Sequence, residues 1–217
     1  VNPETGQVAA LSLQRDLYVR IDGGRRGRIN AAFDASDPNK LINTVRDNFG
    51  IPIDHYIQID FCAFKQLVDS VNGVGVPFAQ RVRDRATGLE IDTTGCVTLD
   101  GDAALAYVRA RKLQYERPVD SGNWIMDPTS DYGRVARQQD FIRRTIDKVV
   151  SNALYRPDVA RALISANAEY VITDSDLTVS RMLAFGNALR GVDTSSIGSY
   201  QVTSTGWNVG GQAVLIP

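Results

Sequence analysis

The apolar and polar positions of this 217-residue chain switch several times between a helical and a strand period. Apolar residues recur at helical spacing in "DPNKLINTVRDNFG", "FKQLVDSVNG" and "LDGDAALAYVRAR", which predicts a helix over each stretch. The first has an Asp-Pro start and a terminal Gly50, and Asp100 is suited to cap the third. A longer helix is predicted from about Asp131 to Asn152, and two more near 157–167 and 176–190.

Strand-like stretches separate these helices. The stretch "IDHYIQIDF" alternates strictly, so its apolar face carries Ile53, His55, Ile57, Ile59 and Phe61. Strands are also predicted at "VAALSL", "RDLYVRI" and "GVGVPFAQRV", and as a pair at "GSYQVTST" and "GGQAVLIP". Loops are predicted at "DGGRRGRI", "RDRATGLEIDTTGC" and "KLQYERPVDSGNWIMDPTS". Strands that alternate with helices, without a linker, predict one α/β domain over residues 1–217.

The first residues, "VNPETGQ", have the composition of a turn that precedes a strand. A hairpin turn needs a strand on both sides. We therefore expect the domain to include a strand upstream of Val1, so that the chain is N-terminally truncated.

Composition limits the possible functions. Hydrophobic residues make up 43% of the chain and charged residues 23%, values that are ordinary for a globular domain. The net charge of −1 argues against a general binder of nucleic acid or anionic membranes, which needs a basic field. No apolar run approaches the length of a membrane span, and there is no signal-peptide pattern. The arginines must therefore act as local clusters.

Cysteine and histidine are too few for the common catalytic sites. Cys62 and Cys96 form no CxxC motif and have no histidine cluster, which excludes a zinc site and a thioredoxin-type centre. They are either one disulfide or two buried thiols. His55, the single histidine, lies on an apolar strand face, which favours a packed core residue over a catalytic base. The chain also lacks a P-loop and a GxGxxG motif.

The long predicted helix combines an apolar stripe with arginines. The stripe contains Phe141, Ile142, Thr145, Ile146 and Val149, while Asp140, Arg143 and Asp147 face solvent. Towards the N-terminus the same stripe continues through Gln138 and Arg134, with Arg137 on its flank. A buried unpaired charge is costly, so an anion must lie close. That anion is either an internal carboxylate, for which Asp84, Asp92 and Glu116 are candidates, or a ligand.

Further arginines favour the ligand. Arg109 and Arg111 follow a helix at spacing i, i+2, and in an extended tail both would project to one side. Arg15 and Asp16 end a predicted strand, and Arg28 lies in a Gly-rich loop. Guanidinium groups bind phosphate oxygens with two hydrogen bonds, so several of them around one cleft suit a diphosphate.

The stretches "SLQRDLYVRI", "GRINAAF", "IDHYIQIDFCAFKQLVDSVNGV", "GCVTLDGDAALAYVRARK" and "SDYGRVARQQDFI" together resemble the LytR-CpsA-Psr family of cell-wall phosphotransferases. Their order and spacing match over about residues 8–150, and the composition is most like actinobacterial members. The resemblance implies an α–β–α sandwich around a central mixed sheet, outside the cell membrane. It also implies an N-terminal membrane helix that this chain lacks.

The resemblance further implies an activity. Family members transfer a glycopolymer from polyprenyl diphosphate to peptidoglycan through a phosphodiester, and in mycobacteria and their relatives the polymer is arabinogalactan. Mg²⁺ is the implied cofactor, and the family's metal-binding and proton-transferring acids lie upstream of this chain. Asp16 is a candidate metal ligand, but not as the sole one. The alternatives are a non-catalytic binding module for polyprenyl-linked glycan, or a polyprenyl diphosphate phosphohydrolase.

Individual residues carry over by their place in the motifs. Arg15, Arg109 and Arg111 match catalytic and diphosphate-binding positions, and Gln138 matches a diphosphate-binding position. Arg134 and Arg137 match basic residues of the same helix motif, and Arg28 stands where many members have lysine, so these three are also expected to bind the diphosphate. The polyprenyl tail would lie in an apolar groove lined by "DHYIQIDFCAF" and the helices after residue 63. The secreted setting favours a Cys62–Cys96 disulfide.

Overall fold

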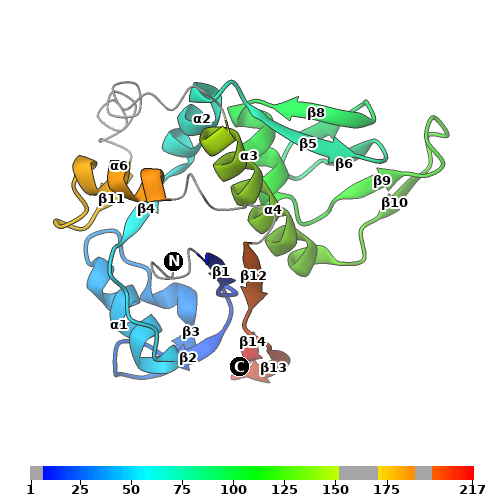
Figure 1. Ribbon diagram of the computed structural model, residues 1–217. Coiled ribbons are helices and arrows are strands. Elements are labelled where there is room, and N and C mark those ends of the chain that lie inside the picture. Colours follow the sequence, from blue (N-terminus) through cyan, green and yellow to red (C-terminus); the bar gives the residue numbers. More distant parts are fainter. Residues whose placement is uncertain (1–6, 152–170, 189–196) are drawn as a thin grey trace. The chain divides into compact units, whose positions relative to one another are not determined.

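The structure is a computed structural model that describes residues 7–151, 171–188 and 197–217 (Figure 1). Helices and strands alternate along the chain, which confirms the predicted α/β class. In the described residues, no helix has both the length and the apolar character of a membrane span. The chain divides into unit 1, comprising Val1–Val8, Gln58–Ile172 and Thr178–Ile197, and unit 2, comprising Ala9–Ile57, Thr173–Leu177 and Gly198–Pro217.

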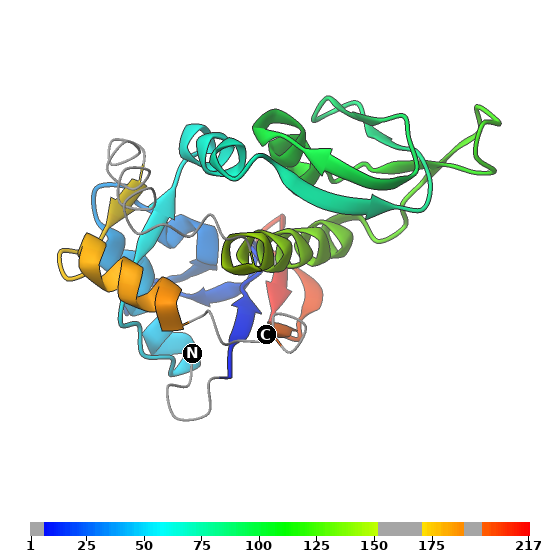
Figure 2. The same ribbon diagram turned by 45° about the horizontal axis from the view of Figure 1, so that its top comes forward.

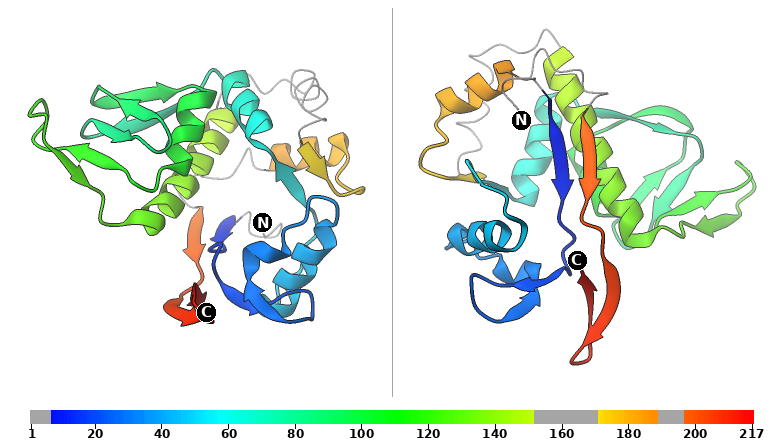
Figure 3. Two further views of the ribbon diagram at one scale, coloured as in Figure 1. Left: turned by 180° about the vertical axis from the view of Figure 1, so that it is seen from behind. Right: turned by 60° about the horizontal axis from the view of Figure 1, so that its bottom comes forward.

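Unit 2 contains a parallel strand pair and two hairpins. Strand β1 (Ala9–Ser12) runs parallel to β12 (Gly198–Gln201), beside it in the right panel of Figure 3. Antiparallel pairs join β2 (Tyr18–Arg20) to β3 (Arg26–Arg28), and β13 (Thr205–Val209) to β14 (Gln212–Ile216). The predicted loop "DGGRRGRI" therefore contains a strand.

The predicted pairing of the last two strands was wrong, because a strand that had not been predicted separates them. Strand β14 pairs with β13, while β12 pairs with β1. The turn between β13 and β14 consists of Gly210 and Gly211, with φ of 57° and 83°. Two successive positive φ angles suit a tight hairpin turn, which joins neighbouring strands.

Helix α1 (Pro38–Phe49) has the predicted ends. The Asp37 carboxylate accepts a hydrogen bond from the Asn39 backbone N–H at 3.2 Å, and the helix ends at Gly50 in the left-handed conformation. Thr44, which is fully buried, donates to the Lys40 carbonyl at 2.7 Å. The core of unit 2 contains Leu17, Val19 and Ile29, the last at the start of the 3₁₀ helix η1 (Ile29–Ala32).

Three helices of unit 1 are confirmed at nearly the predicted positions: α2 (Phe61–Ser70), α3 (Gly101–Arg109) and α4 (Ser130–Ser151) (Figure 2). The Asp100 carboxylate caps α3 by accepting from the Ala103 backbone N–H at 2.9 Å. Helix α6 (Val179–Ala188) lies within the predicted range 176–190. The helix predicted near 157–167 lies outside the described residues.

Two predicted loops of unit 1 form strands instead. Strand β5 (Val74–Phe78) pairs with β8 (Gly95–Leu99). A four-stranded sheet has the order β10 (Trp124–Met126), β9 (Gln114–Glu116), β6 (Val82–Asp84) and β7 (Leu89–Ile91). Each of these four strands has three residues, which is too short for a period to be recognised in the sequence. Strand β4 (Ile57–Ile59) pairs with β11 (Val171–Thr173).

The core of unit 1 confirms only part of the predicted stripe on α4. Phe141 is 1% exposed and lies 5.8 Å from Phe64 between ring centroids. Ile142, predicted to lie on the same stripe, is 55% exposed. Val135, six residues before Phe141, is buried, so the buried face is rotated away from Ile142. The side chain of Val149 lies outside the described part of the chain.

The alternating stretch around His55 is apolar but exposed. Only Ile57–Ile59 form a strand, and Ile57, Ile59 and Phe61 are each about half exposed. His55 is exposed too, with its Nδ1 at 3.3 Å from both carboxylate oxygens of Asp174. The prediction of a packed core histidine was therefore wrong, since the alternation marks an apolar face that the described residues leave open.

The predicted Cys62–Cys96 disulfide is not formed in the structure. Both cysteines are free and exposed. Cys62 lies in the first turn of α2, whereas Cys96 lies on β8 with its Sγ over Gly75 of β5. The prediction rested on the secreted setting and not on any geometry that brings the two residues together.

Candidate functional site

The end of α3 is held by two neighbouring side chains of α4. Gln138 donates from its amide to the Val108 carbonyl at 2.9 Å, and Arg137 donates from Nη2 to the Ala110 carbonyl. Carbonyl groups at a helix C-terminus have no partner within the helix, so side chains often bind them. Arg109 lies between these two anchored residues, and its position is therefore fixed by α4.

Arg109 is the last residue of α3 and is exposed. Its guanidinium carbon lies 4.6 Å from the centroid of the exposed Phe61 ring, a cation–π contact. No carboxylate pairs with Arg109 among the described residues. The predicted extended tail that would place Arg109 and Arg111 on one side was wrong, because Arg109 is still helical.

Arg111 and Arg134 share one carboxylate. The Asp131 Oδ1 lies 3.1 Å from Arg111 Nε and 2.9 Å from Arg134 Nε, and Arg134 Nη2 lies 3.1 Å from Asp131 Oδ2. The Asp131 side chain is 43% exposed and the Arg111 side chain 45%. Two guanidinium groups on one partly exposed carboxylate leave an excess of positive charge that a ligand can reach.

The start of α4 strengthens this positive field. Asp131 and Arg134 lie in the first turns of the helix, where the backbone dipole places partial positive charge. We call Arg109, Arg111 and Arg134 the arginine cluster. It combines three guanidinium groups, one carboxylate and a helix N-terminus, which is an arrangement suited to a polyanionic ligand.

Arg137 has different surroundings. Its side chain is 10% exposed, and Nη1 donates to Asp127 Oδ2 at 3.2 Å, while the Asp127 side chain is 4% exposed. The expected internal partners of this helix were Asp84, Asp92 or Glu116, and that assignment was wrong. Asp127 forms the pair instead, because it lies three residues before the helix start, close enough in space to reach Arg137.

Two of the rejected partners are engaged elsewhere. Asp84 is fully buried, and its carboxylate accepts from the backbone N–H groups of Lys112 at 2.8 Å and Ala86 at 2.9 Å. Glu116 accepts from the Gly122 backbone N–H at 2.7 Å, and this bond chiefly lowers the pKa of its carboxyl group.

Asp127 remains ionised in spite of its burial. Burial raises the pKa of Asp127, but hydrogen bonds from Thr129 and Tyr115 and the charge of Arg137 outweigh it, so the pKa lies below its ordinary value. The Thr129 backbone N–H donates to Asp127 at 2.8 Å and the Thr129 hydroxyl at 2.5 Å. Burial and the bond to Asp127 raise the pKa of Tyr115 to about 12. The carboxylate is thus fully committed to the protein.

The remaining predicted residues lie in unit 2. Arg15 is exposed, two residues before the buried Leu17. Arg28 donates from Nε and Nη2 to the Ala213 carbonyl at 3.1 and 2.8 Å, and its Nε lies 3.5 Å from Asp16 Oδ1. Arg28 is thus tied to β14, whereas the side chain of Arg15 extends into solvent.

The described residues do not fit a magnesium site. Among them, no group of three or more His, Cys, Asp or Glu side chains could hold a metal ion. Asp16, the proposed candidate ligand, is paired with Arg28. Asp16 would therefore be a single carboxylate ligand, and that carboxylate already has a cationic partner.

Two residues of this site, Asp127 and Asp131, were not predicted from the sequence, whereas Phe61 belongs to the stretch that was expected to line the lipid groove. The stretch "DPTS" before α4 contained a usable signal, since Asp two residues before Thr is typical of a turn in which the carboxylate binds the Thr N–H. The spacing of Asp131 and Arg134 at i, i+3 was also visible. Nothing local indicated that Phe61 would meet Arg109.

Comparison with known proteins identifies the relatives of this chain. A model of the LytR_cpsA_psr family matches residues 1–217. "Probable cell wall biosynthesis protein LcpB" of Corynebacterium glutamicum is 31% identical over 222 residues, which cover 98% of this chain and 50% of that protein. The "Polyisoprenyl-teichoic acid--peptidoglycan teichoic acid transferase TagU" of Enterococcus faecalis is 36% identical over 152 residues, covering 70% and 45%. The chain spans about half the length of these curated relatives.

Solved structures show the same fold. The "LytR-Csp2A-Psr enzyme from Actinomyces oris" superposes with a TM-score of 0.80 at 23% sequence identity, covering 100% of this chain and 78% of that chain. Identity this low supports the likeness of fold alone.

Proposed function

Since the chain belongs to the LytR_cpsA_psr family, we propose that it transfers a glycopolymer from a polyprenyl diphosphate carrier to peptidoglycan, forming a phosphodiester. The names of the relatives support this: one is a cell wall biosynthesis protein and another transfers teichoic acid from a polyisoprenyl carrier to peptidoglycan. The polymer is arabinogalactan or a similar wall polysaccharide, as the resemblance to actinobacterial members implies. The reaction takes place outside the membrane, and a membrane helix anchors the whole protein.

The observation that carries the proposal is the contact of Arg109 with Phe61. A polyprenyl diphosphate has a dianionic head joined directly to an apolar chain, so its site must place cations next to exposed apolar surface. The guanidinium of Arg109 lies over the Phe61 ring, and Ile59, two residues before Phe61, is 47% exposed. This is such a junction, with Arg111 and Arg134 supplying further positive charge.

The arginine cluster would act on charge. Diphosphate oxygens would accept hydrogen bonds from Arg109 and would partly displace the Asp131 carboxylate from Arg111 and Arg134. The guanidinium groups would then donate to the phosphate oxygens from fixed positions. During transfer, negative charge builds up on the phosphoryl oxygens, and fixed guanidinium groups stabilise it without reorganisation. Arg137 and Gln138 would position the cluster, because their side chains donate to backbone carbonyl groups at the end of α3.

The first test is binding of a short-chain polyprenyl diphosphate to this chain and to Arg109→Ala, Arg111→Ala and Arg143→Ala, with and without Mg²⁺. Arg143 is the matched control, because it lies on α4, is 35% exposed and pairs with Asp140 outside the arginine cluster. We expect a loss of about tenfold or more for the first two variants, in line with a charge-assisted hydrogen bond, and no change for Arg143→Ala.

Two outcomes would contradict the proposal: full binding by Arg109→Ala, or an equal loss in Arg143→Ala. A further variant, Phe61→Ser, should weaken binding of the polyprenyl compound but not of inorganic diphosphate.

In the complete protein, product formation that requires added peptidoglycan acceptor indicates a transferase. Product without acceptor indicates a phosphohydrolase, and binding without product indicates a carrier module.

A further inference from the structure

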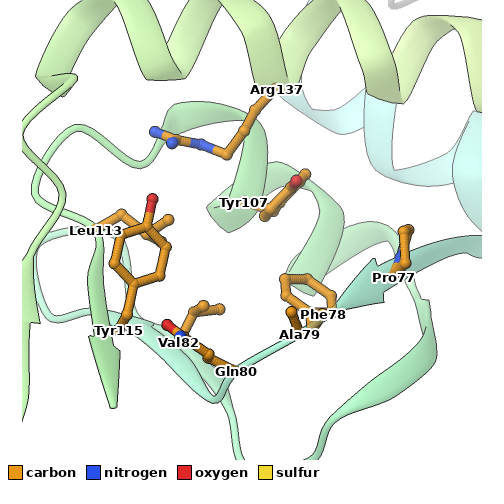
Figure 4. Close-up of a pocket in the computed structure, with 9 residues that line it drawn as sticks. All are labelled: Pro77, Phe78, Ala79, Gln80, Val82, Tyr107, Leu113, Tyr115 and Arg137. Atoms are coloured by element: carbon orange, nitrogen blue, oxygen red, sulfur yellow. The ribbon is translucent and has the colours of Figure 1, made fainter. Parts of the chain in front are cut away.

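A cavity of about 220 Å³ lies in unit 1 between β5, β9 and α4. Its walls include Phe78, Tyr107, Leu113, Tyr115 and Arg137 (Figure 4). Phe78 and Tyr107 meet edge to face, with centroids 5.6 Å apart, so one wall is a rigid aromatic corner. The cavity is larger than the engineered hole of about 150 Å³ that holds a benzene molecule in another protein.

One hydrogen-bond donor in the wall has no protein partner. The Nη1 and Nη2 groups of Arg137 donate to Asp127 and Ala110, but its buried Nε–H has no acceptor among the described residues. The whole side chain is nine-tenths buried. In Figure 4 it extends from α4 over the cavity, with the hydroxyl groups of Tyr107 and Tyr115 on either side. Buried N–H groups rarely lack an acceptor, which points to a ligand atom here.

The charge balance excludes an anion as that ligand. Arg137 is already neutralised by Asp127, whose carboxylate is 4% exposed and also accepts from Thr129 and Tyr115. A second anion would compete with a fully bonded carboxylate in a buried place. The missing acceptor is therefore a neutral oxygen, and the cavity is chemically different from the arginine cluster.

The walls define the rest of the ligand. The Nε–H of Arg137 can donate to a carbonyl, the hydroxyl of Tyr107 can accept from an amide N–H, and Phe78 and Leu113 can cover a methyl group. An acetamido group has these three parts in a small planar unit. The geometry points to a subsite for the acetamido group of an N-acetylated sugar. The acetamido group follows from the cavity, while the sugar that bears it rests on the proposed function.

The test is an NMR titration that follows the side-chain Nε–H signal of Arg137. The probes are the methyl glycosides of N-acetylglucosamine and glucose, and N-methylacetamide, the amide without a sugar. We expect the N-acetylated sugar to shift this signal to saturation. The glucose compound should bind with an affinity lower by about tenfold or more, since it lacks the methyl and the amide.

Matched variants keep the result specific. Ala79 lines the cavity but is exposed, so Ala79→Leu should block entry and abolish the shift while leaving the Arg137–Asp127 pair intact. Ala136→Leu makes the same change at an exposed position of α4 that does not line the cavity, and should leave the shift unchanged.

Three results would overturn the inference. In the first, no sugar moves the signal and Nε–H exchanges magnetisation only with water, so that an ordered water is the acceptor. In the second, glucose and N-acetylglucosamine shift the signal equally. In the third, N-methylacetamide shifts it but the sugar does not, which rejects the sugar subsite and leaves the transferase proposal untouched.

Discussion

Arg134 and Arg137 lie on the same helix three residues apart, yet their carboxylate partners are in opposite surroundings. Asp131, the partner of Arg134, is 43% exposed and also serves Arg111. Asp127, the partner of Arg137, is 4% exposed and bonded by the protein alone. The first arrangement can exchange its carboxylate for a ligand at low cost, because solvent screens the loss. The second cannot, because breaking it leaves a buried charge.

This difference shows how one helix motif can fix the backbone of a neighbouring helix and also supply charge for a ligand. Arginines that are equivalent in the sequence divide their tasks according to the burial of their partners. Arg137 fixes the end of α3 and Arg134 contributes positive charge at the place that is thereby fixed. The following changes test that division, from the largest expected effect to the smallest.

Asp127→Asn should have the largest effect on stability. It leaves the charge of Arg137 buried and unpaired, so we expect the free energy of unfolding to fall by about 3–5 kcal/mol. Asp131→Asn is the control and should cost less than about 1 kcal/mol, since its pairs are exposed to solvent. Urea unfolding of both variants measures the difference. Equal costs would mean that the two pairs do not differ as described.

Gly133→Ala should disturb the Asp127–Arg137 pair by a steric clash and not by a change of charge. A Cβ at Gly133 would overlap Thr129 Oγ1 and would lie 3.0 Å from Asp127 Oδ2 and 3.1 Å from Arg137 Nη1. We expect a loss of about 1–3 kcal/mol from the forced shift. Helix propensity alone would make this change stabilising by about 1 kcal/mol, so the sign of the change in the free energy of unfolding decides between the two effects. Ala136→Gly, at an exposed position of α4, is the control and should cost about 1 kcal/mol.

Acid should weaken the buried pair in a defined direction. The pKa of Asp127 is lowered in the folded state from its ordinary value of 3.8. Between these two values the unfolded chain binds more protons, so the stabilisation is complete above pH 3.8 and is lost as the pH falls through the folded pKa. Over this pH range, the free energy of unfolding should fall more steeply with falling pH for the native chain than for Asp127→Asn. Parallel curves would refute the assignment.

Arg111→Ala should have the smallest effect on stability, below about 1 kcal/mol, because its pair with Asp131 is exposed. The same variant should lose diphosphate affinity, as proposed above. Parallel measurements of urea unfolding and binding on one preparation test both statements. A large loss of stability without a loss of affinity would place Arg111 with Arg137 as a structural residue.

Local sequence determined the helices. Asp37 and Asp100 cap α1 and α3 at the expected places, and the long helix α4 begins and ends within a residue of the prediction. The reason is that helical periodicity and caps depend on residues within one or two turns. The motifs also sufficed to indicate the family, which the match over residues 1–217 confirms.

Tertiary structure alone decided which arginines are committed and which are available. The partners of Arg137 include the Ala110 carbonyl, 27 residues away, and the ring beneath Arg109 belongs to Phe61 on another helix. Such contacts depend on how α2, α3 and α4 pack, and no local pattern contains that information. The three-residue strands β9 and β10 were missed for the same reason, since hydrogen bonds between strands hold them in place rather than any period of their own.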